Sequence, residues 1–328
     1  MNINTLFVPY YYIGNMDDIV EDIKIIIFDE DFNKGHFSKF NRKIDNLPKN
    51  LTHLTLGYSF NKSIDNLPIN LTHLSLGYTF NKSIDNLPKN LTHLTFGHKF
   101  NQLVKNLPKN LTHLTFGRNF NNDIDCNLRN LTHLTLSDYK CNYLRFSNDP
   151  FSYFYKPMMI FPNLTHLYNY YDIHEYSEKL YNYTPYLTNI TLNNYYINPI
   201  DDLPSKLTHL TTGSLFNNTV DKLPKNLTHL TLSNKFNKSI NNLPNKLTHL
   251  ITGNNFNQSI NNLPNTLKYL ILGNSFNKPI DNLPINLEYL SVGINFTYRI
   301  TKLPIGIKEF ILFNKNKIIE KNFLNIDD

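Results

Sequence analysis

Apolar and polar residues recur along this chain with a period of twenty. The segment that starts at Phe60 reads FNKSIDNLPINLTHLSLGYT, and closely similar segments start at Phe80 and Phe100. Phenylalanine keeps this phase at positions 40, 60, 80, 100 and 120, and again at 216, 236, 256, 276 and 296, where Tyr196 precedes it. A fixed period over two long arrays is typical of a repeat protein.

Each repeat contains one run that predicts a strand. The run Leu-Thr-His-Leu-Thr-Leu occupies residues 51–56 and 227–232, with close variants in the other repeats. Its leucines alternate with polar residues, so we expect the leucines to face the interior and the His and Thr side chains to face solvent. A glycine such as Gly57 then marks the turn out of the strand. A proline in every return, such as Pro88, excludes a regular helix on the back of the coil.

These features predict an all-β, leucine-rich-repeat-like solenoid whose 20-residue coils stack into a parallel β-sheet. About fourteen residues per coil remain outside the strand, so the back should be extended or 3₁₀, with little regular helix. The asparagine after each phenylalanine is expected to form an inward ladder that bonds the backbone of adjacent coils. Its members are Asn61, Asn81, Asn101, Asn121, Asn217, Asn237, Asn257 and Asn277.

Interruptions of the period divide the chain into five segments of one continuous solenoid domain. They are an N-terminal cap with a degenerate first coil (1–39), a first repeat array (40–136), an irregular tyrosine-rich insertion (137–186), a second repeat array (187–312) and a C-terminal cap (313–328). In the first cap, IKIIIFDEDF at 23–32 predicts the first strand, and Asp29, Glu30 and Asp31 should polarise its edge. The tyrosines of the insertion either fill irregular coils at a bend or form an interface.

The repeats resemble a known family. FNKPI at Phe276 to Ile280 has the Phe-Asn-x-Pro-Ile signature of FNIP repeats, which occur in amoebae and their large viruses, and FNKSI at 60, 80 and 236 differs only by Ser for Pro. The resemblance covers about 40–312 apart from the middle segment, and the Asn-Leu-Pro portion is also similar to the short leucine-rich repeats of bacterial effectors. Many FNIP proteins carry an N-terminal F-box that recruits a ubiquitin ligase. Too few residues precede Ile23 for such a module, so this role is not carried over.

One side of the predicted sheet is the candidate binding surface. If the strands stack in register, nine of the twelve histidines share one outward row, with hydroxyl side chains beside it and tyrosine replacing histidine in later repeats. The predicted surface comprises His53, His73, His93, His113, His133, Thr55, Ser75, Thr95, Thr115, Thr135, His209, His229, His249, Tyr269 and Tyr289. Crowded parallel imidazoles should resist protonation, so we expect histidine pKa values below the usual 6.5 or so.

Neither a cofactor nor a metal is expected on this surface. Parallel imidazoles form a row rather than a tetrahedron, and no Asp, Glu or Cys completes a ligand set in the repeat. Catalysis is not expected either, because every Ser, His and Asp recurs without a unique partner, and no Gly-rich phosphate loop is present. The sequence therefore predicts a non-catalytic scaffold that binds a protein through its strand-lined face.

Nucleic-acid binding is the alternative function. The formal net charge is +6, but 26 acidic residues are interleaved with the basic ones, whereas a nucleic-acid footprint clusters on one face. The positive excess is also what a solvated surface would show, so nucleic acid is the less favoured partner. No stretch reaches the 18 or so apolar residues of a membrane span.

The sequence also favours an intracellular, cytoplasmic location, in the host cytoplasm if the protein is viral. No secretory signal is recognisable at the N-terminus. Glycosylation at the recurring Asn-Leu-Thr triplets would crowd sugars at the entry of every strand, and Cys126 and Cys141 are read as reduced thiols. The triplets begin at Asn50, Asn70, Asn90, Asn110, Asn130 and Asn226.

Overall fold

The computed structural model describes residues 4–17, 19–30, 32–120, 122, 124, 128–136, 161–170, 184–314 and 317–320. The chain forms two compact units, Met1–Leu167 (unit 1) and Tyr168–Asp328 (unit 2). Most of the tyrosine-rich insertion, both cysteines and the last eight residues lie outside the described residues, as do the predictions made for them. That the five segments form one continuous domain stays a prediction.

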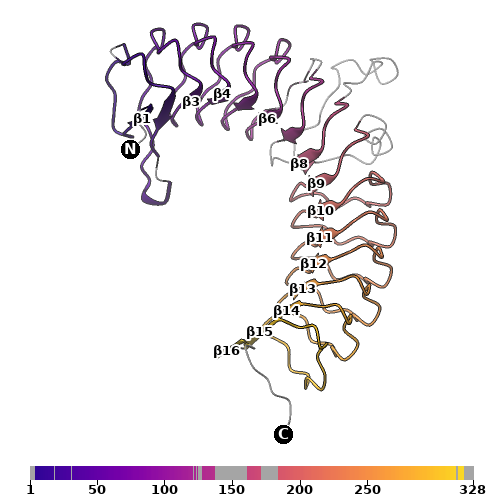
Figure 1. The fold of residues 1–328 in the computed structure, drawn as a ribbon. Helices are drawn as coiled ribbons and strands as arrows, with labels where there is room; N and C mark the ends of the chain where they lie inside the picture. Colours follow the sequence, from indigo (N-terminus) through magenta and orange to yellow (C-terminus); the bar gives the residue numbers. More distant parts are fainter. Residues whose placement is uncertain are drawn as a thin grey trace. The chain divides into compact units, whose positions relative to one another are not determined.

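Unit 1 is a stack of coils with one short strand per coil (Figure 1). Its elements are β1 (Thr5–Val8), β2 (Ile25–Phe28), the 3₁₀ turn η1 (Phe32–Lys34), β3 (His53–Thr55), β4 (His73–Ser75), β5 (His93–Thr95), β6 (His113–Thr115) and β7 (His133–Thr135), and β8 (His166–Tyr170) begins at its end. From β1 to β7 each strand pairs in parallel with the next. From β3 onward the paired residues are twenty apart, as at His73 and His93.

Unit 2 repeats this arrangement. Its strands are β9 (Asn189–Leu192), β10 (His209–Thr211), β11 (His229–Thr231), β12 (His249–Ile251), β13 (Tyr269–Leu272), β14 (Tyr289–Val292), β15 (Glu309–Asn314) and β16 (Lys317–Glu320). Pairing is parallel from β9 to β15. β16 then pairs with β15 in antiparallel fashion, and the C-terminal cap at 313–328 stays a prediction.

The predicted fold class is confirmed: both units are leucine-rich-repeat-like, with parallel strands, 20-residue coils and, among the described residues, essentially no helix. The strands themselves are shorter than the six-residue run predicted. In the second repeat the N–H of Leu71 donates to the carbonyl of Pro68 at 3.1 Å, so Leu71 belongs to a turn although its side chain is buried. The strand begins only at His73.

Leucine and phenylalanine fill the interior of each coil, as predicted. Leu54, Phe60, Phe80 and Phe100 are at most 1% exposed, and successive phenylalanine rings lie 6.2 Å apart. In β3 to β7 and β10 to β12 only the central residue is buried, so the flanking His and Thr side chains face outward. Each buried phenylalanine contributes about 1.5–3 kcal/mol of hydrophobic stabilisation, and it does so through neighbouring coils.

The glycines that follow the strands are required by the close approach of adjacent coils. A Cβ at Gly97 would lie 1.9 Å from the carbonyl oxygen of Gly77, and a Cβ at Gly213 would lie 1.7 Å from that of Asn193. No backbone adjustment of a few tenths of an ångström removes such an overlap. Gly97 and Gly213 therefore need to be glycine because neighbouring backbones touch, in addition to marking a turn.

The asparagine ladder bonds adjacent coils, but the prediction that it points inward was wrong. The Oδ1 atom of Asn61 accepts a hydrogen bond from the N–H of Asn81 at 3.0 Å, and that of Asn237 accepts from the N–H of Asn257 at 2.9 Å. These bonds lie at the partly exposed surface of the coil. The preceding phenylalanine occupies the interior, so the next side chain turns outward.

At the N-terminal end, the prediction that Ile23 begins the first strand was wrong, because β1 precedes it. Thr5 pairs with Ile25, so the run Thr-Leu-Phe-Val already keeps the spacing of twenty and was the signal missed. Glu30 has a more specific role than polarising an edge. Its carboxylate accepts hydrogen bonds from the N–H groups of Tyr58 and Ser38, which satisfies backbone donors in the following coils.

One core position predicts a stabilising substitution. The hydroxyl of Thr212 is the buried side-chain polar atom, among those the structure describes, that has no hydrogen-bond partner. Thr212→Val removes this unpaired group at nearly constant volume, so the free energy of unfolding should rise by about 1 kcal/mol. Urea unfolding measures the change.

Thr252→Val is the matched control at the equivalent position. The Thr252 hydroxyl accepts a hydrogen bond from the N–H of Gly273 at 3.2 Å and contacts the carbonyl of Ile271 at 3.3 Å. Its loss should therefore destabilise the protein. If both valine variants change the free energy of unfolding in the same direction, the unpaired hydroxyl of Thr212 does not destabilise the protein as expected.

Candidate binding face of the stacked strands

The histidines of unit 1 form one continuous stack on the outward side of the strands. From His53 to His133, adjacent ring centroids are 4.0 to 4.1 Å apart and the planes lie within 15° of parallel. His166 extends the stack at 4.1 Å from His133. The strand register also aligns the predicted hydroxyl row of Thr55, Ser75, Thr95, Thr115 and Thr135. The structure therefore brings together every unit 1 residue predicted for this surface.

Each stacked histidine contacts the threonine that precedes it, a partner that the sequence analysis missed. In unit 1 the distance from Thr Oγ1 to His Nδ1 is 2.8 to 3.0 Å. The same hydroxyl also contacts the carbonyl oxygen of the preceding coil, as Thr92 does with Thr72 at 3.1 Å. The Thr-His dipeptide present in nearly every repeat was the available signal.

Unit 2 carries a second row whose chemistry changes along its length. His209, His229 and His249 stack at 4.1 Å, and each contacts its preceding threonine at 2.8 to 2.9 Å. Tyr269 follows at 5.5 Å from His249, and Tyr289 stacks on Tyr269 at 4.2 Å. The row thus passes from imidazole to phenol.

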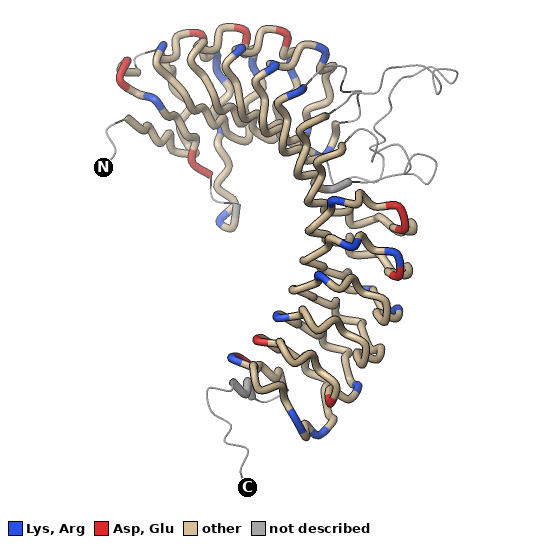
Figure 2. Tube along the Cα trace, turned by 45° about the vertical axis from the view of Figure 1, so that its right-hand side comes forward, with Lys and Arg blue, Asp and Glu red and all other residues tan. Residues whose placement is uncertain are grey.

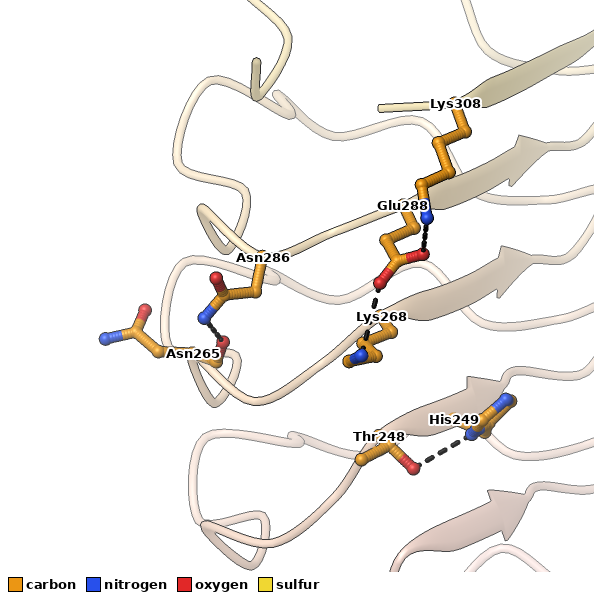
Figure 3. Close-up of polar contacts among 7 residues, drawn as sticks. All are labelled: Thr248, His249, Asn265, Lys268, Asn286, Glu288 and Lys308. Atoms are coloured by element: carbon orange, nitrogen blue, oxygen red, sulfur yellow. Dashed lines mark hydrogen bonds and ion pairs between the residues drawn. The ribbon is translucent and has the colours of Figure 1, made fainter. Parts of the chain in front are cut away.

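The threonines beside the row change at the same place (Figure 3). Lys268, Glu288 and Lys308 replace them, and the carboxylate of Glu288 bridges both ammonium groups, at 3.2 Å in the case of Lys268. The hydrogen bonds from Lys308 and Lys268 hold the pKa of the Glu288 carboxyl below its usual value. These groups are exposed, so the network contributes little to stability and mainly gives this end of unit 2 a different surface.

Seven of the stacked histidines have a lowered pKa, which is the direction expected. Partial burial, followed by the charges of neighbouring imidazoles, lowers the pKa of His93, His133 and His229 to about 4. Partial burial is also the main cause that lowers the pKa of His73, His113, His209 and His249. At neutral pH these seven rings are therefore uncharged.

Unit 1 has a second row of stacked aromatic rings that the sequence analysis did not predict. Tyr58 stacks on Tyr78 at 4.6 Å, Tyr78 on His98 at 4.8 Å, and Phe37 contacts Tyr58 at 4.7 Å. Tyr58, Tyr78 and His98 follow the glycine of their coils, and the Gly-Tyr dipeptides at 57 and 77 were the signal. Their counterparts in unit 2 are Ser214, Asn234, Asn254, Asn274 and Ile294. The aromatic row therefore distinguishes the two units chemically.

Within the described part of the chain, no group of three or more His, Cys, Asp or Glu side chains is arranged to hold a metal ion. None of its helices is both long and apolar enough to cross a membrane.

Five stretches of the chain match the FNIP Repeat model: 40–79, 63–99, 80–106, 100–128 and 236–275. The chain carries FNIP repeats. The resemblance noted in the sequence is thus confirmed in both repeat arrays.

Two solved structures are similar to these FNIP repeats. CroV588, a circular leucine-rich-repeat protein of a giant virus, is 35% identical with a TM-score of 0.79 over 94% of this chain and 46% of its own. The present chain thus spans about half the length of that relative. The internalin InlF of Listeria monocytogenes is 18% identical with a TM-score of 0.55 over 80% of each chain, which shows the fold alone. No curated protein matches the chain.

Proposed function

We propose that this FNIP-repeat solenoid is a non-catalytic scaffold that binds another protein through its strand-lined face. The observation that carries the proposal is the in-register row of stacked rings with hydroxyl side chains beside it. Repeat solenoids form extended binding surfaces of this kind, because stacking repeats aligns equivalent residues in long rows. The inward residues of the same strands are fully used in the core, so only the outward rows are available for recognition.

The ends of the rows supply the specificity. Tyr269 and Tyr289 offer large rings with polar tips, a residue type enriched at protein interfaces. Beside them the Glu288 network adds charge, whereas unit 1 carries the second aromatic row. A partner that contacts either unit therefore meets a distinct combination of groups.

The distribution of charge favours a protein partner over nucleic acid. Register aligns exposed basic residues at one position of the unit 1 coils, Lys49, Lys89, Lys109 and Arg129. Exposed acidic residues occupy the position four residues earlier, Asp45, Asp65 and Asp85. Basic and acidic positions thus occur side by side on the coils of unit 1 (Figure 2), rather than as a single positive stripe. Nucleic-acid binding would instead weaken steeply between about 50 and 200 mM salt.

A cytoplasmic location is part of the proposal. The amide of Asn90 donates to the carbonyl of Ile69 at 3.0 Å, and Asn110 and Asn130 make the same contact in the next coils. Glycans on these asparagines would be separated only by the strand spacing of about 4.8 Å. An assembled stack therefore has no room for them, which favours a compartment without glycosylation.

Affinity purification with quantitative mass spectrometry tests the proposal. His73, His93 and His113 are replaced together by alanine, and circular dichroism checks the fold. Partners captured by the wild type should fall at least tenfold. Lys43, Lys62 and Lys82, which are exposed elsewhere on the coils, are replaced by alanine as the control and should leave capture unchanged. Equal capture by the histidine variant excludes this face as the binding surface.

A further inference from the structure

The contacts beside the histidine rows bear on which ring nitrogen of each imidazole carries the proton. Eight rings whose surroundings are fully described share the same two contacts. In each, a threonine Oγ1 lies 2.8 to 3.0 Å from Nδ1 and 3.0 to 3.1 Å from a carbonyl oxygen of the preceding coil. The rings are His53, His73, His93, His113, His133, His209, His229 and His249.

A threonine hydroxyl has one proton to share between these two neighbours. The carbonyl oxygen can only accept, whereas Nδ1 of a neutral imidazole either donates or accepts. If the hydroxyl donated to Nδ1, no proton would lie between two oxygen atoms about 3 Å apart. Both contacts are hydrogen bonds only when the hydroxyl donates to the carbonyl and Nδ1–H donates to the hydroxyl.

We propose that the stacked histidines are held as the Nδ1–H tautomer, so the face presents rows of unprotonated Nε2 acceptors to a partner that donates hydrogen bonds. Nε2 is the ring nitrogen farther from the backbone, so on an outward side chain it lies on the solvent side. The repeat thereby aligns up to five acceptors in unit 1 and three in unit 2, each about one strand spacing from the next.

This inference rests on the proposed function and specifies the chemistry of the partner. A row of acceptors pairs with N–H or O–H groups, such as Asn, Gln, Ser, or free main-chain amides of an extended segment. On a carboxylate-lined partner, the lone pairs of the carboxylate oxygens would repel the lone pairs of the Nε2 atoms. The net charge of +6 nevertheless attracts acidic ligands in general, so a preference for neutral donors over carboxylates distinguishes recognition from simple attraction.

Nitrogen-15 NMR of the intact, histidine-labelled protein at pH 7.5 tests the tautomer directly. We expect Nδ1 of the eight rings to resonate as protonated and Nε2 as unprotonated nitrogen. Thr92→Val removes the acceptor of His93, so the signals of that ring should move toward the mixture of tautomers seen in water. Thr95→Val, on the same face of the same coil, is the control and should leave them unchanged. Protonated Nε2 signals in these rings overturn the inference.

An array of immobilised 12-residue peptides tests the partner chemistry, with Gly/Ser/Asn/Gln sequences compared against matched Gly/Ser/Asp/Glu sequences at 150 mM salt. The wild type should bind the amide set at least fivefold better, and the triple variant Thr72→Val, Thr92→Val, Thr112→Val should lose this preference. Equal or stronger binding to the acidic set overturns the donor partner. Failure of the proposed function gives a different result. In that case the histidine-to-alanine variant captures partners as well as the wild type does, while the NMR spectra still show the Nδ1–H tautomer.

Discussion

Lowering the pH from 7.5 to 5.0 is expected to reduce the free energy of unfolding by several kcal/mol. In the unfolded chain the histidines protonate near pH 6.5, whereas in the stack partial burial lowers the pKa of His93, His133 and His229 to about 4. Below pH 6.5 the unfolded state therefore binds more protons than the folded state. The histidine contribution is fully present above pH 6.5 and is lost as the pH falls from 6.5 toward 4.

The size of the effect follows from the number of rings. Seven stacked histidines have a lowered pKa. For His93, His133 and His229, whose pKa is lowered to about 4, solvent screening leaves about 1 kcal/mol per ring at pH 5.0, so these three contribute about 3 kcal/mol and the other four add in the same direction. That is a large fraction of the stability of many domains.

Urea unfolding at pH 7.5 and at pH 5.0 measures this loss. Most carboxylates are still ionised at the lower of these two values. Replacing His73, His93 and His113 with glutamine removes three titrating rings from the centre of unit 1 and should flatten the pH dependence markedly. Substituting His36, which stacks on Tyr10 and lies outside the histidine rows, should not. Identical unfolding midpoints at pH 7.5 and 5.0 for the wild type would show that the stacked rings protonate as freely as those of the unfolded chain.

The sequence predicts the fold of each unit well because the fold is periodic. A spacing of twenty between identical strands leaves one register, and the burial of Leu54 or Phe80 follows from alternation within the repeat. The outward histidine and threonine rows follow from the same register. β1 was missed because a single unrepeated Thr-Leu-Phe-Val run lacks the leucine and proline pattern that marks the other coils.

Features outside the strands are harder to predict. Alternation says which way a strand residue points, but a turn has no such rule, so Asn61 was placed inside when its Oδ1 bonds the next coil at the surface. The aromatic row at Tyr58 and Tyr78 follows a glycine in such a turn. The contacts of Thr92 with His93 and Thr72 depend on rotamers and on the distance between coils, neither of which the sequence states.

Replacing a central phenylalanine should have the second large effect on stability, because each ring packs in its own coil and against the coils on both sides. Phe80 is fully buried and lies between Phe60 and Phe100, at 6.2 Å from each. Phe80→Ala removes the ring and leaves a cavity that stacked backbones cannot close, since glycines such as Gly77 already hold neighbouring coils in contact. The free energy of unfolding should fall by about 3–5 kcal/mol.

The position of the lost ring in its stack decides how far the damage spreads. Stability in a solenoid is the sum of each coil and its contacts with two neighbours, so Phe80→Ala should speed hydrogen exchange of the amides at His73 and His93 as well as in its own coil. Phe296 is the control. It lies near the end of its stack, is only partly buried and stacks on one phenylalanine ring, that of Phe276. Phe296→Ala should cost markedly less. Two results would contradict this expectation: an equal loss of unfolding free energy for the two variants, or faster hydrogen exchange confined to the mutated coil. Either would mean that the phenylalanine rings stabilise each coil separately and that contacts between neighbouring coils do not hold the stack together.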